Sequence, residues 1–228
     1  TTERDDNINN VFNDRDVNGS KNTGGRVKIK WLPTDDLSVK WSSDFSERSG
    51  ECCQPQPRSA TPTEAFFLGE VSASEDNDSI NVSAELYNES ESWGHSLEAN
   101  WELGEYTLTS ISAYRDYSSK SNQDVDGTPQ TLLDINAGES NQTQRTQELR
   151  LTSPQNQTLT YVVGLYYFEQ RMNRDFQRVY HDIFGNFVPS FPGLKFGSHY
   201  EATVASVIYS VFGQFYVNIM YPFRLLGG

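Results

Sequence analysis

Hydrophobic and polar residues alternate with a period of two over most of this chain. Around a Pro-Thr-Asp-Asp turn at residues 33–36, every second residue is apolar, and these residues are Val27, Ile29, Trp31, Leu37, Val39 and Trp41. A β-strand with one apolar face produces this pattern, whereas an amphipathic helix repeats every three or four residues. The two segments therefore predict a tight hairpin, and no part of the chain shows convincing helical spacing.

The same alternation predicts further strands. Residues 93–103 and 106–117 form a second expected hairpin through Gly104 and Glu105. Later strands are expected at residues 144–152, 158–171 and 200–218, and a last strand begins at Phe223. Within residues 106–117 the apolar positions change parity after Leu108, and a change of phase inside one strand predicts a β-bulge.

The connections between the expected strands alternate in length. Short turns are expected at residues 33–36, 104–105, 153–157 and 219–222, and long polar connections at residues 47–91, 118–141 and 173–199. Outer-membrane barrels have this asymmetry, with short periplasmic turns and long extracellular loops. We therefore predict an all-β fold in which residues 1–228 form one domain. This domain is an antiparallel up-and-down meander of about eight strands and part of a transmembrane β-barrel.

The first long connection is expected to hold little regular structure, with a short local element near residues 63–68 and a strand near residues 80–87. Aromatic residues lie close to the short turns, as in the interfacial girdle of a barrel, and these are Trp31, Trp101, Tyr106 and Tyr161. In a soluble β-sandwich the same rings would be core residues. A soluble or surface all-β binding module, such as an adhesin or carbohydrate-binding domain, therefore stays open as the alternative.

Composition narrows the possible functions. Hydrophobic residues make up 36% of the chain and aromatic residues 13%, and the mean hydropathy is −0.64. No run of about 18 apolar residues occurs, so we expect no transmembrane helix. The 18 Lys and Arg against 31 Asp and Glu give a net charge of −13, which repels a phosphate backbone. Binding to nucleic acid is therefore not expected.

The sequence contains no recognisable catalytic or metal-binding motif. The two cysteines, Cys52 and Cys53, are adjacent in a polar stretch and define no disulfide framework. The three histidines are far apart in sequence, and the segment from Asp124 to Gly127 resembles the start of a calcium loop without its later acidic ligands. We therefore expect neither an enzyme nor a bound cofactor or metal, and we interpret residues 124–127 as a turn.

The third long connection is the candidate ligand surface, because it concentrates aromatic and cationic side chains. The candidate ligand-binding residues are Arg174, Arg178, Tyr180, His181, Phe184 and Phe187. Such a set can hold an anionic or aromatic ligand through stacking and charge-assisted hydrogen bonds. The alternative is that these rings pack the loop against itself.

Four segments, taken in order, resemble the barrel of TonB-dependent receptors of Gram-negative bacteria. They are Tyr106-Thr-Leu-Thr-Ser-Ile-Ser-Ala-Tyr-Arg115, Gln147-Glu-Leu-Arg-Leu-Thr-Ser-Pro154, Tyr161-Val-Val-Gly-Leu-Tyr-Tyr-Phe168 and Tyr209-Ser-Val-Phe-Gly-Gln-Phe-Tyr-Val-Asn-Ile219. Residues 25–37 are similar to a preceding hairpin of the same receptors, so the resemblance covers nearly the whole chain. Met220-Tyr221-Pro222 departs from the turn that is usual before the final segment.

The resemblance implies a location in the cell outer membrane, in contact with its lipid, and a role in importing a scarce nutrient such as a ferric siderophore. In the family a plug inside the barrel engages the TonB complex, which supplies the energy. Neither a plug nor a TonB-contacting motif is visible here. About eight strands are expected in this chain, compared with about 22 in the family. We therefore expect a truncated chain, which does not transport alone. Ligand identity does not follow from the sequence.

Overall fold

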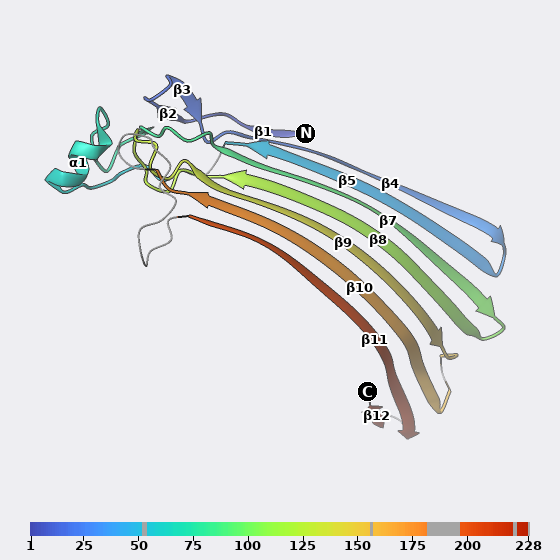
Figure 1. Cartoon of the computed structure of the whole chain (residues 1–228). Coiled ribbons are helices and arrows are strands. Elements are labelled where there is room, and N and C mark those ends of the chain that lie inside the picture. Colours follow the sequence, from blue (N-terminus) through green and yellow to red (C-terminus); the bar gives the residue numbers. More distant parts are fainter. Residues whose placement is uncertain (52–53, 156, 182–196, 221–222, 228) are drawn as a thin grey trace, which may run out of the picture.

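The computed structural model describes residues 1–51, 54–155, 157–181, 197–220 and 223–227. A single antiparallel sheet dominates these residues, and its strands follow one another in chain order (Figure 1). In spatial order the nine strands are β1 (Thr2–Arg4), β4 (Ser20–Thr34), β5 (Leu37–Gly50), β7 (Tyr87–Leu103), β8 (Tyr106–Asn122), β9 (Ile135–Thr152), β10 (Leu159–Val179), β11 (Ser198–Met220) and β12 (Phe223–Gly227). The predicted all-β meander of about eight strands is confirmed.

The short turns lie together at one end of the sheet, which we call the turn side, and the long connections lie at the other end, the loop side (Figure 1). The predicted hairpins are confirmed, since Thr34 pairs with Leu37 and Leu103 pairs with Tyr106. The predicted bulge in β8 is wrong. Its pairing with β7 and β9 runs without a register shift.

The strands extend further toward the loop side than the alternation predicted. The connection expected at residues 47–91 shortens to 51–86, and the one expected at 118–141 shortens to 123–134. The third connection, expected at residues 173–199, begins only after Val179 and ends before Ser198. In these extensions both faces of the sheet carry mostly polar side chains. Period-two hydrophobicity is therefore lost although the backbone ladder continues.

A small, separately packed unit lies on the loop side, and we call it the cap. It contains a second sheet of β3 (Arg15–Val17), β2 (Ile8–Asn10) and β6 (Ser79–Ile80), together with helix α1 (Pro62–Leu68). The helix confirms the short element expected near residues 63–68, whereas only the start of the strand expected at 80–87 forms, as β6. The cap has a hydrophobic core, which consists of Ile8, Val17, Ile80, Val82, Ala84 and Leu86.

The polar side chain of Asn10 lies inside this core and joins β2 to the backbone at Val82. Asn10 is 1% exposed; its Nδ2 donates to the Val82 carbonyl at 3.0 Å, and its Oδ1 accepts from the Val82 amide at 3.1 Å. The N-cap Thr61 starts α1 by a reciprocal capping box with Glu64. None of the described helices is long and apolar enough to cross a membrane.

Candidate functional site

The sheet has two chemically different faces. Residues paired across antiparallel strands point to the same side, and successive residues point to opposite sides. Trp41, Leu97, Ser112, Gln147 and Tyr167 are paired in one continuous row, which defines the face that we call the apolar face. The other face, the polar face, holds their neighbours along each strand.

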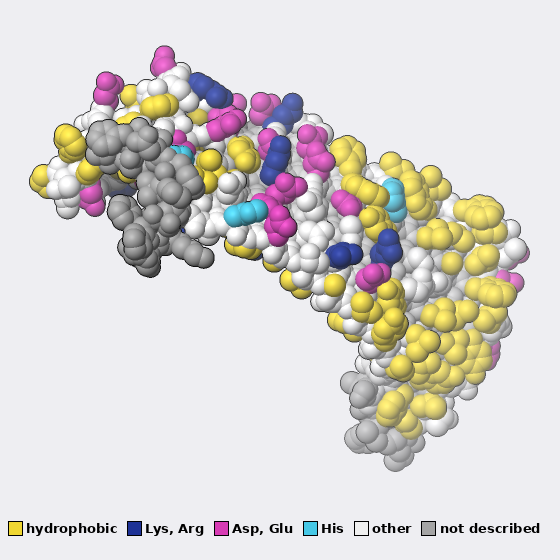
Figure 2. Space-filling model, in the orientation of Figure 1, with side chains coloured by type: hydrophobic (Ala, Val, Ile, Leu, Met, Phe, Trp, Pro, Cys, Tyr) yellow, Lys and Arg dark blue, Asp and Glu magenta, His cyan; other side chains and the backbone are white. Residues whose placement is uncertain are grey.

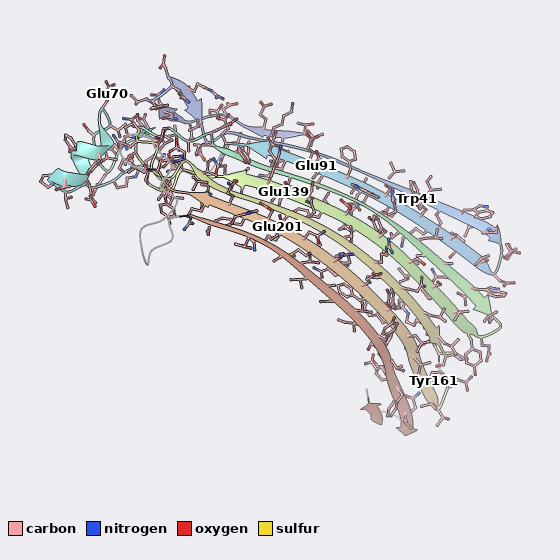
Figure 3. The ribbon with its side chains drawn as sticks, in the orientation of Figure 1. Trp41, Glu70, Glu91, Glu139, Tyr161 and Glu201 are labelled. Atoms are coloured by element: carbon pink, nitrogen blue, oxygen red, sulfur yellow. The ribbon has the colours of Figure 1, made fainter. Side chains whose placement is uncertain are left out.

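On the turn side, the apolar face presents a broad hydrophobic surface, the apolar band. Its most exposed members are Val27, Ile29, Trp31, Trp41, Phe45, Trp93, Leu97, Trp101, Leu103, Tyr106, Leu149, Leu159, Val163, Leu165, Val207, Tyr209, Val211 and Phe215. Figure 2 shows hydrophobic side chains gathered over the turn-side halves of the strands and charged side chains closer to the loop side. In Figure 3, Trp41 and Tyr161 mark the first region, and Glu91, Glu139 and Glu201 the second.

Three polar residues interrupt the apolar band, and they bond to one another. The Ser112 hydroxyl donates to Gln147 Oε1, and Gln147 Nε2 donates to the Ser110 hydroxyl at 3.1 Å. This trio explains the incorrect bulge prediction. Ser110 and Ser112 occupy apolar-face positions of β8 while Ile111 lies on the polar face, so the hydrophobic alternation slips without any change in the backbone.

The polar face carries ion pairs across neighbouring strands. Asp44 accepts from Arg115 at 3.0 Å and lies 3.7 Å from Arg26, and Lys40 donates to Glu98 at 2.6 Å. These side chains are partly exposed, so each pair contributes at most about 1 kcal/mol. Across β4, β5, β7 and β8, this face is therefore suited to contact with water.

Gly94 allows the central ion pair of the polar face to form. A Cβ at this position would lie 3.0 Å from the Arg115 guanidinium carbon and 3.1 Å from the Tyr114 carbonyl oxygen. The absence of a side chain lets Arg115 cross β7 to reach Asp44 on β5.

The structure places two of the predicted ligand residues on a strand rather than in a loop. Arg174 and Arg178 lie on β10, where both occupy the polar face near the loop side. Arg178 donates from Nε to Asn136 Oδ1 at 2.8 Å, and its guanidinium lies 5.6 Å from the Phe176 ring centroid. Phe176 stacks on Tyr200 with a centroid distance of 5.4 Å. These five residues form what we call the basic-aromatic patch.

The remaining predicted ligand residues are only partly placed. Tyr180 and His181 follow β10 directly, and the His181 amide donates to the Leu132 carbonyl at 2.9 Å, which ties this segment to the preceding connection. Phe184 and Phe187 lie outside the described residues, as do Cys52 and Cys53.

Two groups of described side chains bring three potential metal ligands within 4.8 Å of one another. The first joins Asp134 to Asp124 and Asp126 of the expected turn. Protein donors already engage each carboxylate: Gly127 donates its amide to Asp124 at 2.6 Å, Leu133 donates its amide to Asp126 at 2.8 Å, and Ser83 donates its hydroxyl to Asp134 at 2.9 Å. Burial raises the pKa of Asp124 to about 6, and the neighbouring Asp126 carboxylate adds to this rise.

The second group is exposed and lies on the apolar face beyond the apolar band. His199 Nε2 is 2.9 Å from Asp175 Oδ2, and Glu201 is the third member. The expectation that the chain has no metal site stays a prediction.

Sequence reasoning missed Asn136 and Tyr200 as neighbours of the candidate arginines. They belong to β9 and β11, far from Arg178 in sequence, and only the pairing register brings them together. Tyr166 lies on the polar face, next to Tyr167 of the apolar face. Counting every second residue from Tyr166 would have placed Arg174 and Arg178 on the polar face.

The chain matches no protein-family model, and no curated protein matches it by sequence. Its structure is similar to the crystal structure of the ferric yersiniabactin uptake receptor FyuA from Yersinia pestis. The TM-score is 0.69 and the sequence identity 14%, over 98% of this chain and 31% of the receptor. At this identity the similarity shows the fold alone. The predicted barrel-type sheet is confirmed, since this fold matches part of the barrel of a TonB-dependent receptor. The chain corresponds to less than a third of that receptor's length.

Proposed function

We propose that this chain forms a section of the barrel wall of a TonB-dependent receptor in the outer membrane of a Gram-negative bacterium, where it takes part in importing a scarce nutrient such as a ferric siderophore. The apolar band is the observation that carries the proposal. From Trp93 to Leu103, β7 advances ten residues, or about 34 Å at about 3.4 Å per residue. A strand tilt of about 40° converts this to about 26 Å across the membrane, close to the band height typical of outer-membrane barrels.

The polar face fits the water-filled interior of such a barrel. The ion pairs of Asp44 with Arg115 and of Lys40 with Glu98 would be costly in lipid, but they are ordinary in water. A curved sheet with one face suited to lipid and the other to water is the arrangement that a membrane barrel requires.

A β-sandwich module is the competing function, and the fold supports it less well. A sandwich buries its apolar strand faces against a second sheet. Within the described residues nothing packs over the apolar band, where Trp31 is 63% and Val211 81% exposed. The three-stranded sheet lies on the loop side instead.

We place ligand contact at the basic-aromatic patch. Arg174 and Arg178 face the proposed interior beside Phe176 and Tyr200, and cations next to aromatic rings suit an anionic, aromatic ligand. Energy for uptake would come from the TonB complex, acting through a plug.

Uptake of radiolabelled ferric yersiniabactin and other ferric siderophores by the cells that make this chain tests the proposal. We expect the protein in the outer-membrane fraction, and uptake that a protonophore abolishes. Substitution of both Arg174 and Arg178 by Gln should reduce uptake roughly thirtyfold, since each lost charge-assisted hydrogen bond is worth about 1 kcal/mol. Lys40→Gln, on the same face nearer the turn side, is the matched control and should leave uptake unchanged. Recovery in the soluble fraction, with no energy-dependent uptake, would favour the sandwich module.

A further inference from the structure

The apolar face holds an open depression at the point where the apolar band meets the charged loop side. Its volume is about 400 Å³, and side chains that line it include Trp41, His95, Leu97, Tyr114 and Arg145. The His95 ring stacks on Trp41 at a centroid distance of 6.0 Å. The depression is therefore continuous with the band and is walled largely by aromatic rings.

One cation, Arg145, lines the loop side of this depression, and a second, Arg171, lies on the neighbouring strand. The Arg145 guanidinium carbon is 5.9 Å from the Tyr114 ring centroid, and its side chain is 66% exposed. Arg171 lies on the same face, diagonally across from Arg145, because Arg145 pairs with Glu169 and Arg171 is two residues further along β10. Arg171 is exposed and forms no ion pair with any described residue.

The acidic groups near the rim only partly neutralise these cations. Glu169 lies 3.9 Å from Arg145 and also accepts a hydrogen bond from the Tyr167 hydroxyl at 3.0 Å. Asp116, in the row of Arg171, accepts from the Tyr114 hydroxyl at 3.4 Å. On β10 the next acid on this face is Asp175, four residues or about 13 Å beyond Arg171. Toward β10, the two guanidinium groups of Arg145 and Arg171 therefore have one carboxylate, that of Glu169, beside them.

We propose that this depression binds a phosphorylated membrane lipid, with its phosphate between Arg145 and Arg171 and an acyl chain along Trp41 and Leu97. The inference rests on the proposed function, because it needs the apolar band to lie in a membrane. Guanidinium groups bind phosphate through charge-assisted, often bidentate hydrogen bonds. Along their own strands, both arginines lie on the loop side of the last band residue, which is Leu149 on β9 and Leu165 on β10. Lipid headgroups lie at such an edge of an apolar band. Free inorganic phosphate would leave the apolar walls unused.

Quenching of tryptophan fluorescence by brominated lipids tests this inference. Trp31→Phe and Trp101→Phe would leave Trp41 and Trp93, which lie next to the depression, as the only tryptophans of this chain. The receptor purified from its own cells is placed in vesicles of brominated phosphatidylcholine, or in neutral vesicles that contain a minor fraction of brominated lipid with a phosphate monoester headgroup. The matched variants are Arg145→Gln with Arg171→Gln, and Lys120→Gln, a cation on the same face nearer the loop side.

We expect the phosphorylated lipid to quench more strongly than its mole fraction predicts. The double arginine variant should lower its relative affinity roughly thirtyfold, at about 1 kcal/mol for each arginine, while Lys120→Gln retains it. Equal quenching of all variants by the phosphorylated lipid would overturn the inference. Loss of the quenching by this lipid when inorganic phosphate is added in excess would also overturn it. Quenching by phosphatidylcholine reports the membrane placement separately. If it persists in every variant, the proteins are embedded and the comparison is valid; if no lipid quenches, the proposed function fails together with the inference.

Discussion

At the scale of single residues, the apolar face shows how a polar group is tolerated where lipid is expected. Gln147 bonds to both Ser110 and Ser112, so the amide and the two hydroxyls satisfy one another. In lipid no water replaces a lost partner, which makes an unpaired polar group costly. The alternation changes phase at the two serines and predicts a bulge, because the sequence could not show that the three side chains meet.

Gln147→Ala should therefore destabilise the membrane-embedded protein by about 1–2 kcal/mol, because both serine hydroxyls lose their partner. The triple change, with Ser110→Ala and Ser112→Ala added, should recover most of this loss. Urea unfolding in lipid vesicles measures the difference, and Gln142→Ala on the polar face is the control. Strictly additive effects of the three substitutions would contradict the coupling.

At the scale of elements, strand length and cap packing are the features that alternation did not reveal. The long strands extend beyond the apolar band because backbone pairing continues where side chains no longer alternate. The cap joins β2 and β3 to the segment around Val82, and Asn122 of β8 bonds to the carbonyls of Glu85 and Asp134. No local pattern predicts contacts between segments this far apart in sequence.

Asp124 lies against the cap, where it accepts from the Ala84 amide at 3.3 Å. The cap should become less stable as the pH rises through about 6. The folded pKa of Asp124 lies above its ordinary value of 3.8, so its contribution is fully present below about pH 4 and lost on ionisation. A pKa rise from 3.8 to about 6 corresponds to at most about 3 kcal/mol. Water access to the cap reduces this, and we expect on the order of 1 kcal/mol.

Amide hydrogen exchange at Val82 and Ala84, corrected for intrinsic exchange rates, measures this dependence. Protection should be greater at about pH 5 than at about pH 7.5. Asp124→Asn removes the titrating group and should flatten the profile, apart from a smaller contribution of the same sign from Asp134, whose pKa burial also raises. Greater protection at the higher pH would contradict the assignment.

At the scale of the whole molecule, the sheet has two open edges, one along β4 and one along β11. Along β4, residues 24–34 pair only with β5, and along β11, residues 198–214 pair only with β10 among the described residues. Unpaired backbone groups on these edges cannot be satisfied in lipid. The described strands therefore need further pairing along both edges before the proposed wall can close.

The chain refolded alone in detergent should lack the stable, heat-modifiable form of a closed barrel. Electrophoresis with and without boiling measures this, and the FyuA receptor serves as a control that should change mobility. A compact species of this chain that shifts on boiling would show that it closes by itself.

The sequence by itself determined the all-β class, the antiparallel order of the strands, the position of the hairpin turns and, except in β8, the side of the strand that carries the apolar band. These properties are local, because the alternation lies within the sequence of each strand, and turn residues show where the strand ends on the turn side. Only the tertiary structure decided the loop-side strand ends, the core of the cap, the meeting of Asp134 with Asp124, and the placement of Arg145 beside Arg171. These depend on register and on contacts between distant segments, where the gain comes from packing and pairing that no short stretch of sequence contains.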